Sequence, residues 1–153
     1  MEPRSESKAR KGESISNAEK EAIAKEMLIQ YAGRKMETNN RLERLVVLRQ
    51  ADENKRTSFA VDYTQQITPR IQENKRFLDG IEKAVQKIAD PLEREVLQMR
   101  YMDGNACRLT GWKEVAFQLY KDDSAANVTA AHRLHRKALH TLAVILESEG
   151  ANE

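Results

Sequence analysis

The stretch SAANVTAAHRLHRKALHTLAVIL, residues 124–146, decides how the C-terminal part of the chain folds. Its inward positions recur at steps of three or four residues, which predicts a single helix with one buried face. These positions are Val128, Ala131, His135, Ala138, Leu142 and Ile145. The opposite face carries Thr129, His132, Arg133, Arg136, Lys137 and His140. No Asp or Glu occurs between Ser124 and Glu147, so this second face is uniformly basic.

A helix with one apolar and one basic face is typical of two settings, an anionic membrane surface and the major groove of DNA. The preceding residues favour DNA. The segment WKEVAFQLY, residues 112–120, predicts a short amphipathic helix, and the polar residues 121–123 predict a break after it. Two helices joined in this way, the second longer and basic, predict a helix-turn-helix whose second helix enters the groove while the first braces it.

The same region resembles the helix-turn-helix of sigma-factor region 4. Three segments carry the resemblance: DPLEREVLQMRYMDG at 90–104, WKEVA at 112–116 and HRLHRKAL at 132–139. More closely, residues 18–146 resemble the ArpU/RinA type of small phage-encoded regulators of Gram-positive bacteria. This resemblance implies an N-terminal helical hairpin, a C-terminal sigma-region-4-like module, a phage context and contact with host RNA polymerase. The chain departs from the family in its longer connections before and after the 112–120 helix.

The composition favours an elongated all-α protein. Of the 153 residues, 33% are charged and 5% are aromatic, with only 6 glycines and 3 prolines. The net charge of +2 means that any affinity for nucleic acid must come from a local arrangement of charge. The single Cys107 excludes an internal disulfide framework. Because the chain has neither a membrane-length apolar run nor a signal-peptide core, we expect a cytoplasmic protein with no membrane partner.

The N-terminal half predicts a disordered tail over residues 1–15 and a helical hairpin over residues 16–89. The first helix of the hairpin begins at Ser16, which forms a capping box with Glu19, and runs to about residue 56. Its inward seam consists of Leu28, Tyr31, Leu42 and Leu45, with Lys35 and Thr38 in the middle positions.

Residues 59–63 are expected to connect the two helices of the hairpin. The second helix is expected to begin between residues 64 and 68, with Thr68 as the cap before Pro69. Its seam alternates steps of four and three, which is a heptad pattern, and Asn74 within it could set the register. The seam consists of Ile67, Ile71, Asn74, Leu78, Ile81, Val85 and Ile88. The pattern leaves two alternatives open, a homodimer through this seam and packing within one chain.

Residues 90–148 are predicted to form the DNA-binding domain, followed by a tail at 149–153. The third helix, 92–102, is capped by Asp90 and ends at Asp103-Gly104. About sixty residues are enough for a small core, so this fragment is expected to fold alone. The expected core consists of Leu92, Val96, Leu97, Tyr101, Trp112, Val115, Leu119, Val128, Leu134, Ala138 and Leu142.

No catalytic, cofactor or metal motif is recognisable. The sequence contains no Cys-x-x-Cys, no His-Glu-x-x-His, no phosphate loop and no Gly-x-Ser-x-Gly elbow. We therefore expect neither an enzyme nor a bound cofactor or metal. The histidines are better explained as helix-surface and core residues, with His135 packing inward.

The leading interpretation is a sequence-specific DNA-binding transcriptional regulator of phage or prophage late genes, which binds double-stranded DNA. Arg133, Arg136 and Lys137 are the expected phosphate contacts. The residues expected nearer the base edges are Asn127, Thr129, Ala130 and His132. Two alternatives remain: a protein-interaction adaptor that binds host RNA polymerase, and a DNA-packaging protein like a small terminase subunit.

Overall fold

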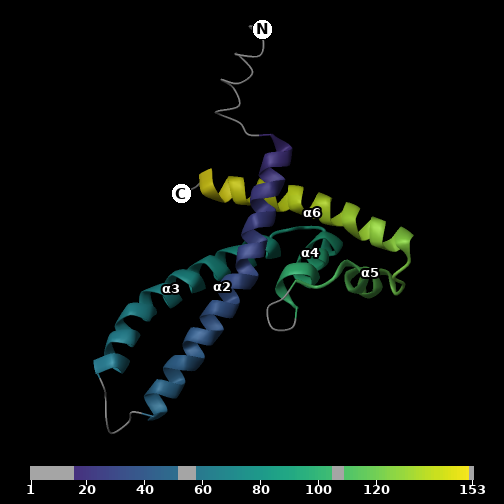
Figure 1. The fold of residues 1–153 in the computed structure, drawn as a ribbon. Coiled ribbons are helices and arrows are strands. Elements are labelled where there is room, and N and C mark those ends of the chain that lie inside the picture. The colour runs from purple at the N-terminus through teal and green to yellow at the C-terminus, as the bar shows by residue number, and fades with distance from the viewer. Residues whose placement is uncertain (1–15, 52–57, 105–108, 152–153) are drawn as a thin grey trace, which may run out of the picture.

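Two long helices, α2 and α3, form a hairpin, in which α2 runs from the top to the lower left of the molecule in Figure 1 and α3 returns toward the middle. The computed structural model describes residues 16–51, 58–104 and 109–151. These residues form α2 (Asn17–Ala51), α3 (Ser58–Gln86), α4 (Pro91–Leu97), a π-helical turn η1 (Gln98–Met102), α5 (Trp112–Tyr120) and α6 (Ala125–Ala151). Within these ranges there is no β-strand, which confirms the prediction of an all-α chain. The tail expected at residues 1–15 lies outside the described residues.

The start of α2 agrees with the sequence prediction. The backbone N–H of Glu19 donates to the Ser16 hydroxyl oxygen over 3.2 Å, and that hydroxyl donates to the Glu19 carboxylate over 3.2 Å. The first bond is one half of the expected capping box and satisfies one of the amides that a helix start leaves free, while the Glu19 carboxylate is held by the Ser16 hydroxyl. The first part of the predicted α2 seam is buried, at Leu28, Tyr31 and Thr38, whereas Lys35, Leu42 and Leu45 are half-buried.

The start of α3 was predicted too late. The helix begins at Ser58, so residues 59–63 belong to it and Pro69 lies in its interior. Two threonine hydroxyls fit the helical conformation by donating to the carbonyl four residues earlier, Thr64 to Ala60 over 2.9 Å and Thr68 to Thr64 over 2.7 Å. Ala60 is buried, so this first part of the helix gains packing that offsets the hydrogen bond missing at Pro69.

The heptad seam of α3 packs against α2 of the same chain. Ile71, Ile81, Val85 and Ile88 are buried, while Ile67 and Leu78 are half-buried. Asn74 is fully buried and donates its amide to the Glu37 carboxylate of α2 over 2.7 Å. Because the seam is already covered within the chain, it offers no surface for the homodimer that the heptad pattern left open.

The connection into α4 confirms one prediction and corrects another. Asp90 caps the helix by accepting from the Leu92 N–H over 2.9 Å, as expected. However, Leu92 was expected in the core and is 52% exposed. Glu93 is buried in its place and accepts a hydrogen bond from the Thr141 hydroxyl of α6 over 2.5 Å. The polar contact between α4 and α6 turns the adjacent Leu92 outward.

One continuous core joins the hairpin to the C-terminal helices. The long helix α6 crosses α2 (Figure 1) and also packs against α4 and α5. Ion pairs tie its last turns to the hairpin, from Lys20 to Glu147 over 2.9 Å and from Lys87 to Glu149. The helix therefore continues to Ala151, past residue 148. The core consists of Ala24, Leu28, Tyr31, Ile81, Ala84, Val85, Ile88, Val96, Leu97, Tyr101, Val115, Ala116, Ala131, Ala138, Leu139, Leu142 and Ala143.

Candidate nucleic-acid interface

A tight turn without glycine connects α5 to α6. Lys121 ends α5 in the left-handed conformation, with φ 63°, and its N–H bonds to the Phe117 carbonyl over 2.7 Å. Ser124 then accepts from the Asn127 N–H over 3.3 Å, which caps the start of α6. The predicted break between the two helices is confirmed, and it places the first turn of α6 beside the end of α5.

Helix α6 has the two faces that its sequence predicts. Ala131, His135, Ala138 and Leu142 are buried against α2, α4 and α5, whereas Val128 and Ile145 are half-buried. The outward side chains form a row that we call the α6 basic row. It consists of Thr129, His132, Arg133, Arg136 and Lys137, all of them exposed. The row belongs to the N-terminal two-thirds of the helix.

The three long cations of the α6 basic row are free of intramolecular ion pairs. Among the described residues, no carboxylate pairs with Arg133, Arg136 or Lys137. Farther along the helix the situation changes, since His140 lies 3.6 Å from the Glu21 carboxylate of α2. The unpaired positive charge is therefore concentrated between residues 129 and 137, where it is available to an external anion.

Two of the residues that the sequence predicted near the base edges, Asn127 and Ala130, do not belong to the α6 basic row. The Asn127 amide nitrogen donates to the Asp122 carbonyl over 3.1 Å and to its carboxylate over 3.3 Å. That side chain is thus used to hold the turn before α6. Ala130 is half-buried beside the inward face. Of the predicted base-contact set, Thr129 and His132 are the exposed members.

An aromatic and cationic cluster holds α5 against the middle of α6. The Trp112 ring centroid lies 4.2 Å from that of His132 and 4.7 Å from that of His135. On the other side, the Arg100 guanidinium lies 4.7 Å from the Trp112 ring and donates to the Thr110 carbonyl over 2.6 Å. Trp112 is half-buried and packs on the core, in agreement with its predicted role as an anchor for α5.

The π-helical turn η1 supplies two residues of this cluster. The Asp103 N–H bonds to the Gln98 carbonyl five residues earlier, over 2.8 Å, instead of the usual four. This wider turn directs Tyr101 into the core while the next residue back, Arg100, reaches the Trp112 ring. The expected third helix over 92–102 is therefore α-helical at first and π-helical at its end.

His135 is a neutral core residue. Its Nε2 lies 2.6 Å from the Tyr101 hydroxyl. Burial, together with the nearby charges of Lys25, Arg100, His132 and Arg136, lowers the pKa of His135 to about 4. Burial also raises the pKa of Tyr101, so its hydroxyl stays protonated and donates to Nε2. His135 is thus inward-facing, as predicted, and is not part of the basic row.

Sequence reasoning missed two contributors to this region. Lys113 is exposed on the first turn of α5, next to Trp112. The lysine stands in the WKEVA segment, which predicted the bracing helix, but no sequence pattern assigned it to the interface. Lys25 of α2 lies close enough to lower the pKa of His135. No local pattern could have placed Lys25 there, because the crossing of α2 and α6 joins residues about a hundred positions apart.

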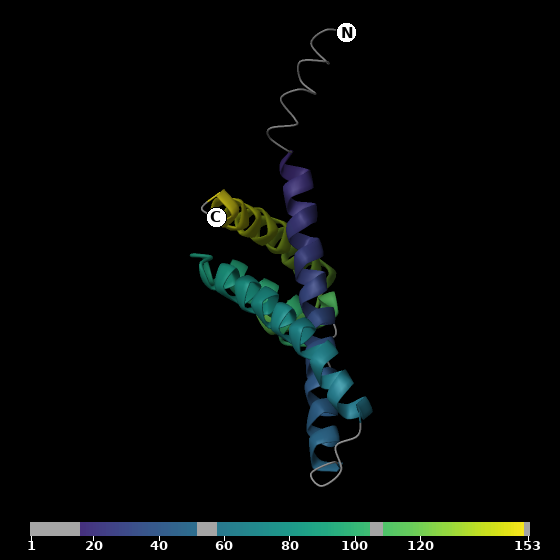
Figure 2. The same cartoon turned by 90° about the vertical axis from the view of Figure 1, so that its left-hand side faces the viewer.

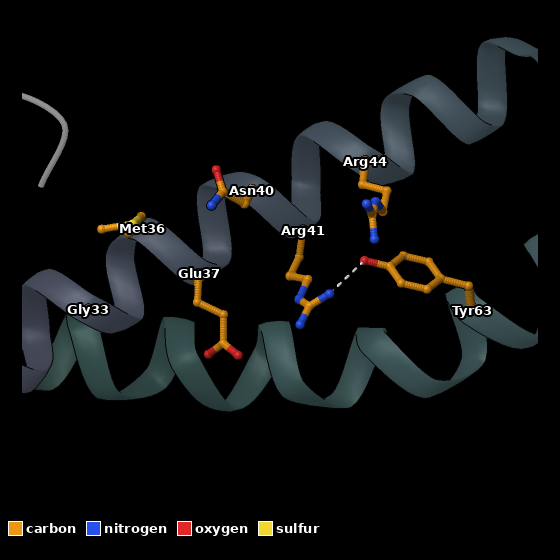
Figure 3. A pocket seen from close by; sticks show the side chains of 7 residues that line it. All are labelled: Gly33, Met36, Glu37, Asn40, Arg41, Arg44 and Tyr63. Carbon is orange, nitrogen blue, oxygen red and sulfur yellow. Dashed lines mark hydrogen bonds between the residues drawn. The ribbon is translucent and has the colours of Figure 1, made fainter.

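A concave region runs along α2 and reaches Tyr63 of α3 (Figure 3). It is an open groove of about 540 Å³ lined by Gly33, Met36, Glu37, Asn40, Arg41, Arg44 and Tyr63. The Arg41 guanidinium donates to the Tyr63 hydroxyl over 3.3 Å, and the Arg44 guanidinium lies 5.8 Å from the same ring. Glu37 is engaged by Asn74 and Arg70, so the charged groups of the lining are one carboxylate, already paired, and two guanidinium groups.

In the described ranges, no group of three or more His, Cys, Asp or Glu side chains is placed to hold a metal ion. None of the helices in those ranges combines the length and apolarity needed to span a bilayer. Comparison with protein-family models, with curated proteins and with solved structures finds no match to this chain.

Proposed function

We propose that this protein binds double-stranded DNA through the α6 basic row and regulates transcription. The observation that carries the proposal is the row itself, in which Arg133, Arg136 and Lys137 are exposed and free of ion pairs among the described residues, on the part of α6 before Glu147, which has no acidic residue. DNA carries a dense line of phosphates, and cations that neutralise them release counterions. A net charge of only +2 makes this concentration of charge the main source of affinity.

The arrangement of α5 and α6 suggests how the contacts would divide. Arg133, Arg136 and Lys137 would meet phosphates and position the protein on the duplex. Thr129 and His132 lie nearer the start of α6, where recognition helices touch base edges. Lys113 at the start of α5 would add a phosphate contact from the bracing helix. Because Trp112 holds His132 at 4.2 Å between ring centroids, that imidazole would enter the groove already oriented.

The resemblance to the ArpU/RinA type extends this proposal to its biological context. It suggests control of phage or prophage late genes and contact with host RNA polymerase. The adaptor alternative places the main function in binding polymerase, and the terminase-like alternative places it in DNA packaging. The unpaired cations of α6 favour a role that includes DNA, which counts against an adaptor that never touches nucleic acid.

The test is a DNA-binding titration of the full-length protein. A duplex is first enriched from a random library, and fluorescence anisotropy then compares it with a scrambled duplex over a series of salt concentrations. Arg136→Ala and Lys137→Ala should each weaken binding to both duplexes and lower the salt slope by about one unit, because each removes about one phosphate contact. Lys75→Ala, on the exposed side of α3, is the matched control and should leave both quantities unchanged.

Two results would contradict the proposal. If the wild-type protein binds neither duplex at low salt, the chain does not act through DNA. If it binds but the Arg136 and Lys137 variants keep the wild-type slope, the interface lies elsewhere on the molecule.

A further inference from the structure

One side of α2 has no packing partner among the residues that the structure describes. Its packed side is buried through Ala24, Leu28, Tyr31 and Thr38. In Figure 2, α2 runs along the molecule with α6 and most of α3 lying to one side of it. The opposite side presents a line that we call the α2 outer stripe. It consists of Ala18, Ala22, Ile29, Gly33, Met36, Asn40 and Val47, all exposed.

The α2 outer stripe is a straight apolar seam. At 3.6 residues per turn, its members lie within about 30° of a single line along the helix. Ile29, Met36 and Val47 are 37%, 43% and 59% exposed, which is unusual for large apolar side chains at such regular spacing. In Figure 3, Met36 and Asn40 lie along α2 without reaching toward α3, whereas Glu37, Arg41 and Arg44 point toward it. A Cβ at Gly33 would meet nothing within 4 Å, so the seam has space at its middle.

Charged residues border the α2 outer stripe in a symmetric pattern. Lys25 and Glu43 lie along one border, and Glu26 and Arg44 lie along the other, about 50° from the seam on either side at 3.6 residues per turn. All four are exposed, and none forms an ion pair within the part of the chain that the structure describes. On each border a positive and a negative residue stand equally far from the middle of the stripe, which lies between residues 34 and 35.

We propose that a second copy of this chain packs on the α2 outer stripe, with the two α2 helices antiparallel about a two-fold axis near residues 34 and 35. In that arrangement each border faces the same border of the other copy. Lys25 then meets Glu43 of the partner subunit, and Glu26 meets Arg44 of the partner subunit, which gives four complementary pairs. Small residues also meet large ones along the seam, with Gly33 opposite Met36 of the partner subunit and Ala22 opposite Val47 of the partner subunit.

The seam favours the antiparallel arrangement over a parallel one. In a parallel pair, Lys25 would also meet an opposite charge, Glu26 of the partner subunit, but seam residues would face their own kind, Met36 beside Met36 of the partner subunit and Gly33 beside Gly33 of the partner subunit. The antiparallel pair alone sets large seam residues opposite small ones while it also places each border charge next to an opposite one. This proposal concerns the assembly of the protein and does not depend on whether α6 binds DNA.

Charge reversal tests the antiparallel pairing directly. Glu26→Arg and Arg44→Glu each place like charges together at both symmetric contacts, so each variant alone should dimerise roughly tenfold to hundredfold more weakly than the wild type. In an equimolar mixture of the two variants, the reversed position 26 of one chain faces the reversed position 44 of the other. The mixture should therefore recover dimers, as measured by sedimentation equilibrium.

Several results would overturn the proposal. These are a wild-type chain that stays monomeric up to the highest soluble concentration, variants that dimerise as well as the wild type, or a mixture that stays monomeric. Lys75→Glu is the control for charge reversal away from the stripe and should dimerise normally. Circular dichroism checks that each variant folds. If the first pair does not fold, Lys25→Glu and Glu43→Lys repeat the test on the other border.

Discussion

At the scale of single residues, the most informative position is His135. It sits on the helix with the basic outer row, yet its pKa of about 4 keeps it neutral at pH 7. Desolvation is the main cause, and nearby cations add to it. The imidazole therefore acts as a buried hydrogen-bond acceptor for Tyr101, and its titration is linked to folding.

We expect the free energy of unfolding to fall as the pH is lowered from about 6.5 toward 4. In this window the unfolded chain binds a proton at His135 and the folded chain does not. The stabilisation that comes from the neutral His135 is therefore fully present above pH 6.5 and is lost as the pH falls toward 4. The loss should amount to roughly 3 kcal/mol at most. Urea unfolding at a series of pH values measures it. His135→Gln keeps an acceptor for Tyr101 without a titrating group and should flatten the pH dependence between these limits.

Titration of Glu37 also decreases the free energy of unfolding as the pH falls, but in a lower pH range than His135. Its hydrogen bond from Asn74 lowers the pKa of the carboxyl below 4.5, so its contribution is lost as the pH falls through the folded value. The wild-type curve below pH 4.5 therefore contains both groups. A His135→Gln variant that keeps the full wild-type slope between pH 6.5 and 4.5 would show that His135 is not the group responsible.

At the scale of elements, the packing of α3 decides the stability of the hairpin. Ile81 is buried in the seam between α2 and α3. Ile81→Glu places an unpaired carboxylate there, which should cost about 3 kcal/mol or more in the free energy of unfolding. Leu92→Glu is the matched control, because Leu92 is apolar like Ile81 but exposed. This substitution should change the free energy of unfolding by about 0.5 kcal/mol or less. Thermal melting followed by circular dichroism compares the two, and equal melting temperatures would contradict the burial of Ile81.

The sequence predicted helix faces better than helix limits. Regular spacing identified the inward side of α3 and α6, because burial must repeat with the helical period. The start of α3 was missed because a proline usually marks the first turn of a helix. Here the helix extends eleven residues before Pro69, and the burial of residues such as Ala60 outweighs one lost hydrogen bond. Local rules do not include such long-range packing.

At the scale of the whole molecule, the core crosses the boundary predicted at residues 89 and 90. Leu28 and Ile81 of the hairpin share one cluster with Leu97 and Leu142 of the C-terminal helices. We therefore now expect a fragment of residues 90–153 to be much less stable than the full chain, because it would expose the surface of α6 that α2 covers. Calorimetry should show one unfolding transition for the full chain and no cooperative transition for the fragment at the same temperature.

A fragment that melts cooperatively near the temperature of the full chain would support the prediction of two separate domains. The crossing of α2 and α6 could not be read from the sequence, since each helix taken alone predicts only that it has an apolar side. The same limit applies to the candidate site. The exposed cations were identified from spacing, but the hydrogen bonds of Asn127 to Asp122 and the stacking of Trp112 on His132 depend on how separate elements meet.

The π-helical turn at Gln98–Met102 has a consequence for the ancestry of the chain. Such a turn holds one residue more than an α-helical turn. It is therefore the structure expected when one residue is inserted into an α-helix and the helix continues on both sides of the insertion. Removing that residue would rotate α4 by about 100° relative to everything that follows. A homologue with an ordinary helix here should be one residue shorter, and the gap in its alignment should fall between residues 98 and 102.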